Sequence, residues 1–218
     1  MSISIENFVK TIYLQEQRMG GDTRPGTLSK LLNITNAATT DMARSLADKQ
    51  LVDYTKYQKL SLTPEGRKLA LSILRKHRLW EAFLSKTLNL SLHQIHDEAE
   101  RLEHLTSDFL ADKIDEYLNF PALDPHGDPI PCSDGMETRE SDAIVLSKAE
   151  IDKDYTIVRL FSSNPNFFDF CAANNITIGK EIQIKKKFNE MKMIEVSLGE
   201  KNLLLNEEFT NIIYVESK

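Results

Sequence analysis

The sequence predicts a mainly α-helical protein with a small β domain at the C-terminal end, and three observations support this fold class. Apolar residues recur at helical spacing through most of residues 1–120, two short β-like runs follow the third helical stretch, and alternating β-like runs begin at Ile144. This order predicts four parts: a winged helix-turn-helix over residues 1–63, a helical metal-binding and dimerisation domain over 64–120, a Pro-rich linker over 121–143 and an SH3-like β-barrel over 144–218.

The winged helix is expected to contain three helices and a hairpin. The first helix should cover residues 4–18, because five apolar residues follow a 3.6-residue stripe there: Ile5, Phe8, Val9, Ile12 and Tyr13. After the Pro25-Gly26 breaker, the other elements are expected in this order: a short helix over 28–33 capped by Thr27, a longer helix over 36–49, and β-like runs over 51–54 and 59–62. The two β-like runs, joined by Thr55-Lys56-Tyr57-Gln58, would form the wing.

A winged helix of this order points to DNA as a partner. The helix after the turn enters the major groove, and the wing reaches the flanking backbone. Seven residues are the candidates for contacting DNA: Thr35, Asn36, Thr40, Asp41, Arg44, Lys56 and Lys59. Residues 1–63 carry eight Lys or Arg against six Asp or Glu, a charge of +2 on a chain of net charge −6, which is compatible with this reading. Two alternatives stay open: the Thr and Asn residues only cap the helix, or the winged helix binds another protein.

The helical domain is expected to open with a long helix over residues 64–87, which has Pro64 at its first turn. Two shorter helices follow near 92–105 and 107–118. The second of these carries five large apolar residues: Phe109, Leu110, Ile114, Tyr117 and Leu118. Such a surface favours a helical homodimer interface, although packing within the chain would explain the pattern equally well.

Side chains of the kinds that bind metal ions gather on two of these helices. His77 and Glu81 lie on the first, and His96, Glu100, Glu103 and His104 fall within an arc of about 100° on the second. Carboxylates crowded beside a buried face repel one another and are costly to desolvate, and a divalent cation would remove that cost. The alternative is a solvated acidic helix surface without metal. Imidazole and carboxylate ligands together suit a borderline or hard first-row metal.

The C-terminal part is expected to be a β-barrel that follows an extended linker. Five short runs read as strands around one helical turn at 166–173: residues 155–160, 181–186, 193–198, 201–205 and 212–215. The sequence has no apolar run of transmembrane length and no signal peptide. Its two cysteines, Cys132 and Cys171, are expected to be reduced thiols. We therefore expect a cytoplasmic protein that does not contact the membrane.

Two blocks of sequence resemble those of the diphtheria toxin repressor and manganese transport regulator family. They are Lys76-His-Arg-Leu-Trp-Glu81 and His96-Asp-Glu-Ala-Glu-Arg-Leu-Glu-His104, and the winged helix and the run Pro125-His-Gly-Asp-Pro-Ile-Pro131 are similar too. The resemblance implies a cytoplasmic homodimeric repressor that binds palindromic operators of metal-uptake genes, with Fe(II) or Mn(II) as corepressor. It implies metal ligands at seven positions: His77, Glu81, His96, Glu100, Glu103, His104 and Asn7.

Several positions depart from the family pattern. Glu100 stands where iron-type members have Cys, so the site lacks a thiolate and we favour Mn(II), with Fe(II) or another divalent transition metal as alternatives. Lys10 stands where some manganese-type members have a further Glu, and an ammonium group cannot bind a metal. Asp124 and His126 of the linker would complete a second site with Glu81, unless His126 is a solvated turn histidine. Asn164 and Asp169 lie near the place of a ligand from the barrel.

Two other functions compete with that of a metal-dependent repressor. A metalloenzyme would need His-Glu-x-x-His, its inverted form, or two Glu-x-x-His repeats on separate helices, and none of these is present. We therefore expect no enzyme and assign no catalytic residue. A winged-helix regulator that senses no metal is the second alternative, and a metal-dependent gain in thermal stability would exclude it.

Overall fold

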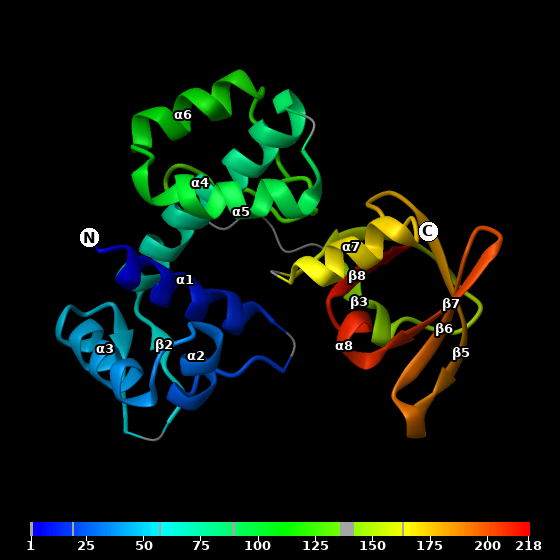
Figure 1. Ribbon diagram of the computed structural model, residues 1–218, viewed down its shortest axis with the longest axis horizontal. Helices are drawn as coiled ribbons and strands as arrows, with labels where there is room; N and C mark the ends of the chain where they lie inside the picture. Colours follow the sequence, from blue (N-terminus) through cyan, green and yellow to red (C-terminus); the bar gives the residue numbers. More distant parts are fainter. Residues whose placement is uncertain (1, 19, 57, 89, 136–141, 163) are drawn as a thin grey trace. The chain divides into compact units, whose positions relative to one another are not determined.

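The computed structural model describes residues 2–18, 20–56, 58–88, 90–135, 142–162 and 164–218 (Figure 1). The chain forms two compact units. Unit 1 comprises Met1–Leu79, Ala99–Tyr117 and Ile130–Thr138, and unit 2 comprises Trp80–Glu98, Leu118–Pro129 and Arg139–Lys218. The fold class is confirmed, because unit 1 is largely helical and unit 2 contains a six-stranded antiparallel sheet. The boundaries of the four predicted domains stay a prediction.

Unit 1 begins with the predicted winged helix. Its elements are α1 (Ile3–Gln17), α2 (Pro25–Leu31), α3 (Asn36–Asp48), β1 (Val52–Asp53) and β2 (Ser61–Leu62). The apolar stripe of α1 is buried against α2, α3 and the hairpin, with Phe8, Ile12, Leu28 and Leu46 at most 1% exposed. Tyr57, at the predicted wing tip, lies outside the described residues.

The start of α2 corrects a prediction. The helix begins at Pro25 instead of Leu28, and Thr27 lies inside it. Pro25 occupies the first turn, where its missing N–H costs nothing. The Thr27 hydroxyl donates to Asp22 Oδ2 at 2.7 Å instead of capping the helix. A Pro-Gly pair therefore opens this helix, although the same pair in the sequence reads as a breaker.

Two long helices run through both units. They are α4 (Pro64–Leu88) and α5 (Leu92–Leu102), and they are followed by the 3₁₀ turn η1 (Glu103–Leu105) and by α6 (Asp108–Tyr117). Gly66 sets the start of α4 close to the wing, because a Cβ there would lie 1.9 Å from the Leu51 carbonyl oxygen. The predicted helix over 92–105 is thus two elements, since the last turn tightens at Glu103. None of the described helices is both long and apolar enough to span a membrane.

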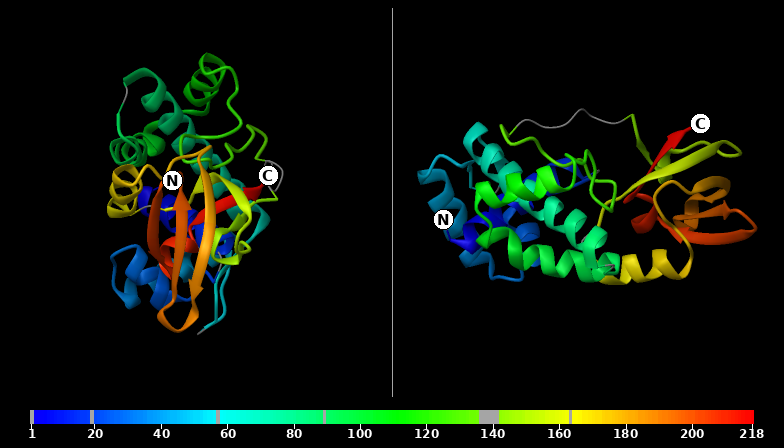
Figure 2. Two further views of the ribbon diagram at one scale, coloured as in Figure 1. Left: turned by 90° about the vertical axis from the view of Figure 1, so that its right-hand side faces the viewer. Right: turned by 90° about the horizontal axis from the view of Figure 1, so that it is seen from above.

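Unit 2 contains the predicted barrel, a six-stranded sheet in the order β3-β8-β4-β5-β6-β7 with antiparallel neighbours (Figure 2). The bounds are β3 (Ile144–Val145), β4 (Asp154–Leu160), β5 (Glu181–Phe188), β6 (Met193–Leu198), β7 (Lys201–Asn206) and β8 (Ile213–Ser217), with the helices α7 (Pro165–Ala173) and α8 (Glu207–Thr210) and the 3₁₀ turns η2 (Leu146–Lys148) and η3 (Asn189–Met191). The five expected strands and α7 are confirmed, while β3 and α8 were not expected. Part of the predicted linker, residues 136–141, lies outside the described residues.

The two thiols are expected to differ sharply in reactivity. Both are free, Cys132 is exposed, and Cys171 is buried in the barrel core, where burial raises the pKa of its thiol to about 12. Because the thiolate is the reactive form, iodoacetamide at pH 8 should modify Cys132 and leave Cys171 intact in the folded chain. Peptide mass spectrometry before and after denaturation checks this. Equal labelling of both cysteines in the folded chain would contradict the burial of Cys171.

Candidate metal centre

One cluster of predicted metal ligands lies entirely in unit 2. Glu81 on α4, His96 on α5 and His126 in the loop before the barrel place one ligand atom each within 4.8 Å of the others. His96 Nδ1 lies 3.1 Å and His126 Nε2 3.2 Å from the same oxygen, Glu81 Oε1. Glu81 and His126 are buried, at 2% and 3% exposure. Two imidazoles and a carboxylate thus converge on one enclosed point.

His126 is held in place by its own loop and by the barrel. The Asp124 carboxylate accepts the backbone N–H groups of His126 and Asp128 at 2.8 and 2.9 Å. The Leu160 backbone N–H donates to the His126 carbonyl at 2.8 Å, and the His126 ring packs on Phe168 with 4.6 Å between ring centroids. The loop is therefore an ordered part of unit 2, and the reading of His126 as a solvated turn histidine is wrong.

A glycine and a bulge allow the close approach of this loop to β4. Gly127 has a φ of +82°, and a Cβ there would lie 2.0 Å from the Val158 carbonyl oxygen. The register between β4 and β8 shifts between Ile157 and Arg159, which turns Val158 out of the regular ladder. Arg159 then forms an ion pair with Asp128. The His126 loop therefore packs against β4 at the position of the bulge.

The surroundings of His126 favour a positive charge. Burial alone would lower the pKa of its imidazole, but the Glu81 carboxylate, helped by Asp124 and Asp128, outweighs burial and raises this pKa. Neither ring nitrogen of His126 has a hydrogen-bond partner among the described residues. A divalent cation would use the same negative field and the nitrogen donors, so the residues present fit a metal ion here.

The second cluster of predicted ligands lies entirely in unit 1. Glu100 on α5 and Glu103 and His104 of η1 place ligand atoms within 4.8 Å of one another. Lys10 of α1 reaches into this cluster, and its Nζ lies 2.6 Å from both Glu100 Oε1 and Glu103 Oε1. The other oxygen of Glu103 is 2.6 Å from His77 Nδ1. Both oxygens of the fully buried Glu103 carboxylate therefore already have positively charged or N–H partners.

His104 and Asn7 complete the surroundings of this second cluster. His104 Nδ1 lies 2.6 Å from Glu6 Oε2, whereas its Nε2 lies 3.3 Å from Glu103 Oε1 without the geometry of a hydrogen bond. The side-chain oxygen of Asn7 is buried and has no hydrogen-bond partner among the described residues. Burial alone would lower the pKa of Lys10, but Glu103 and Glu100 together raise it, so the ammonium stays charged.

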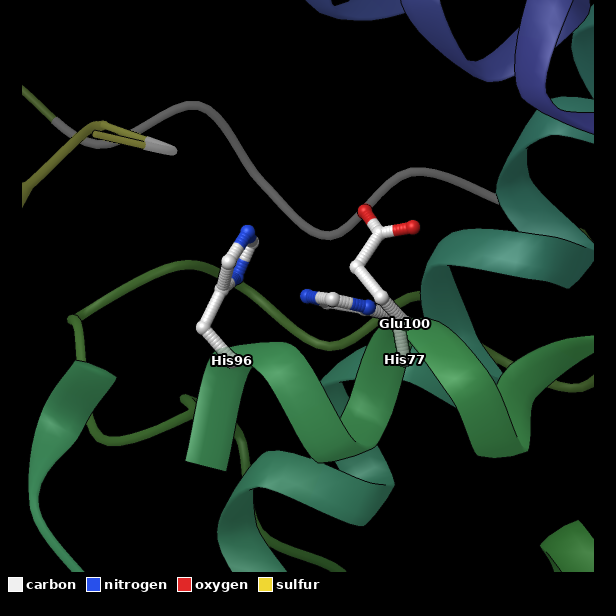
Figure 3. Close-up of side chains that lie close together, drawn as sticks. All are labelled: His77, His96 and Glu100. Atoms are coloured by element: carbon white, nitrogen blue, oxygen red, sulfur yellow. The ribbon is translucent and has the colours of Figure 1, made fainter. Parts of the chain in front are cut away.

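The structure thus distributes the predicted ligands over two units. Figure 3 shows His96 and Glu100 one turn apart on the same side of α5, and His77 coming from α4 beside Glu100. His77, Glu100, Glu103, His104 and Asn7 belong to unit 1, whereas Glu81, His96, Asp124 and His126 belong to unit 2. Among the latter, Asp124 directs one oxygen at its own loop. Asn164 caps α7 and is exposed, as is Asp169.

The predicted DNA-binding residues lie on one part of the winged helix. Asn36, Thr40 and Lys56 line a hollow of about 500 Å³ together with two further cations, Arg24 and Lys30, that sequence reasoning missed. Asp41, Arg44 and Lys59 are exposed, and Arg44 pairs with Asp41 at 3.3 Å. The hydroxyl of Thr35 accepts the Ala38 N–H at 3.1 Å, so this residue caps α3, as the alternative reading expected.

A winged helix followed by a buried His and Glu cluster defines a DNA-binding regulator with a site for a cation. Residues 63–132 match the family described as "Iron dependent repressor, metal binding and dimerisation domain". The diphtheria toxin repressor of Corynebacterium diphtheriae is 28% identical over 97% of this chain and 96% of its own length. The solved structure "Manganese-dependent transcriptional repressor complex with manganese" has a TM-score of 0.91 at 29% identity, over 98% of this chain and 100% of that one.

Another solved structure, "Manganese-dependent transcriptional repressor", is 33% identical and has a TM-score of 0.72 over 82% of this chain and 92% of that one. The chain belongs to the diphtheria toxin repressor family of metal-dependent transcriptional repressors. Its relatives in this family are regulators that respond to divalent metals.

Proposed function

We propose that this chain is a divalent-metal-dependent transcriptional repressor whose metal ion is held by Glu81, His96 and His126. The observation that carries the proposal is the convergence of His96 Nδ1 and His126 Nε2 on one buried oxygen of Glu81. One buried and one half-buried imidazole beside a buried carboxylate are common in metal sites, and burying such a group of side chains without a metal ion is costly. When bound, the metal supplies positive charge and three bonds that fix this cluster. The partner is DNA, so we place the protein in the cytoplasm.

We favour Mn(II) as the metal, with Fe(II) as the alternative. The donors in the cluster are nitrogen and oxygen, and neither cysteine belongs to it. A site without sulfur loses the preference for soft ions and suits manganese and iron. Relatives whose names or titles specify manganese and iron agree with this range of metals.

The link from metal to DNA runs along α4. This helix starts at Pro64, directly after the wing, and carries Glu81 about 25 Å further along its axis. Fixing Glu81 against His96 and His126 therefore restrains the far end of an element whose near end is anchored in the winged helix. We propose that this restraint selects the arrangement of reading helices that fits two operator half-sites.

A homodimer would present two such winged helices to a palindromic operator. Four apolar side chains of η1 and α6 are exposed, which suits a self-complementary interface: Leu105, Phe109, Leu110 and Tyr117. Ile114 and Leu118, from the same predicted set, are buried within the chain. The apolar residues of this region thus divide into an inner set, which packs in the chain, and an outer set for the partner.

Operator binding measured by fluorescence anisotropy tests the proposal. DNA selected from the source genome is titrated with the protein at fixed salt, with Mn(II), Fe(II) under anaerobic conditions, or a chelator. We expect tight binding with metal and a loss of roughly 5- to 150-fold with the chelator, the range of typical allosteric coupling. Equal affinity in the chelator would leave a winged-helix regulator that senses no metal, and the proposal would fail.

Arg44 gives a separate prediction for the DNA surface. Arg44 is exposed on α3, and Arg44→Ala should weaken operator binding by about 1–3 kcal/mol, roughly 5- to 150-fold, if it reads a base. If Arg44 contacts only phosphate, the loss should be similar for all sequences and the salt slope should fall by about one. Lys201→Ala, an exposed lysine of the barrel, is the matched control. Unchanged operator binding by Arg44→Ala would contradict the assignment of α3 as the helix that enters the major groove.

A further inference from the structure

We propose that the ammonium group of Lys10 takes the place of a metal ion between Glu100 and Glu103, so that α1 is tied to α5 and η1 without metal. The inference concerns only unit 1, where both carboxylates and the lysine lie. The inference depends on the proposed function in one respect only, namely that a metal ion binds at the Glu81 cluster.

The position of Lys10 Nζ carries the proposal. It is 2.6 Å from one oxygen of each carboxylate, and a transition-metal ion would have to lie about 2.0–2.2 Å from the same two atoms. A metal ion on these two oxygens would therefore lie within about 5 Å of the ammonium nitrogen, compete with it for the same lone pairs and be repelled by its charge. Lys10 and a metal ion therefore compete for this pair of carboxylates.

The surroundings of Lys10 oppose its displacement by a metal ion. The residue is 5% exposed, and its side chain starts from the buried face of α1, next to Phe8 and Val9. A carboxylate that is deprived of this partner is left buried, since the Glu103 side chain has no exposed surface. Breaking a buried pair in this way is strongly destabilising. The sequence indicates that an ammonium group cannot bind a metal, and only the structure places this group between two carboxylates.

Charge supports the same conclusion. Glu100 and Glu103 carry two negative charges, and Lys10 balances one of them while His77 contacts the other oxygen of Glu103. A divalent ion added beside the ammonium would bring three positive charges against two negative ones. The side-chain oxygen of Asn7 and Nε2 of His104 have no hydrogen-bond partner in the described part of the chain, and they are the ligands that a metal would meet once Lys10 is removed.

Counting bound Mn(II) in variants of the full chain tests the inference. Equilibrium dialysis with elemental analysis is run on His126→Ala, which disables the Glu81 cluster, and on His126→Ala combined with Lys10→Ala. We expect no Mn(II) above buffer in the first and one ion per subunit in the second. Lys76→Ala in the same background is the matched control, because among the described residues Lys76 pairs with one carboxylate, Asp108, and its loss should add no ion.

Two results would overturn the inference. One is an Mn(II) ion in His126→Ala that Glu103→Gln removes, because metal would then bind in the presence of Lys10. The other is a folded double variant that gains no ion. A wild-type chain that binds no Mn(II) would instead refute the proposed function. In that case, a gain of one ion on Lys10→Ala would still support the present inference.

Lysine labelling of the wild-type chain gives a readout that does not depend on any variant folding. Reductive methylation should leave Lys10 unmodified both without metal and at saturating Mn(II), whereas the exposed Lys201 is modified in both. Peptide mass spectrometry reports both sites. Modification of Lys10 that appears only with Mn(II) would show that metal displaces the ammonium, contrary to the inference.

Discussion

Changing His126 to alanine is expected to abolish most of the thermal stabilisation that Mn(II) gives the folded chain. A ligand that binds only the native state at 100 times its Kd contributes about 2.7 kcal/mol. For a chain of this size that corresponds to a rise in Tm of about 5–10 °C. Without His126 the cluster keeps only Glu81 and His96, and two ligands hold a metal ion poorly. The rise should therefore fall to near zero, as measured by calorimetry with and without Mn(II).

The matched control for this experiment is His93→Ala. His93 lies on the same helix as His96, is partly exposed, and pairs with Asp97 at 3.7 Å. It belongs to neither cluster. The full rise in Tm should therefore persist in His93→Ala. A rise that survives in His126→Ala as well would show that the metal binds elsewhere and would refute the ligand assignment.

Changing Phe109 to glutamate is expected to convert the proposed homodimer into a monomer. Phe109 is 72% exposed, and burying such a ring contributes about 2 kcal/mol. In a twofold interface each change counts twice, so about 4 kcal/mol is lost, or roughly a thousandfold in the dimer Kd. Sedimentation velocity at micromolar protein should then show one subunit in place of two.

Met191→Glu provides the control for the dimer experiment. Met191 in η3 of the barrel is 73% exposed, so it is as accessible as Phe109 but lies far along the chain from α6. This variant should sediment as the wild-type chain does. A Phe109→Glu chain that remains dimeric would place the interface on another surface. The operator affinity of the monomer should also fall, because only one half-site can be read at a time.

Most of the helical architecture could be predicted because its signals are local. The apolar stripe of α1 and the Pro at the start of α4 are readable within a few residues, and both elements were placed within one residue of their bounds. The start of α2 was missed because Pro25-Gly26 fits a breaker and a helix N-terminus equally well. The 3₁₀ turn η1 at Glu103 was also missed, because the apolar pattern of the sequence does not change there.

The division of the ligand set could not be read from the chain. One helical face carries His96, Glu100, Glu103 and His104, so periodicity assigns them to one site. Their partners come from distant segments: Lys10 is 90 positions before Glu100, and His126 lies in a run that reads as a solvent-exposed linker. Only tertiary packing brings an ammonium to one end of the face and a buried imidazole to the other.

The packing of the His126 loop against β4 also sets the order in which parts of the chain can fold. Leu160 and Arg159, which hold the loop, belong to a strand whose partners β5 and β8 lie further along the chain. During synthesis the winged helix can fold long before β8 (Ile213–Ser217) has been made. A chain under synthesis would therefore complete its winged helix early and the proposed metal site last. A response to metal through this site would thus require a chain that has been synthesised and folded as far as β8.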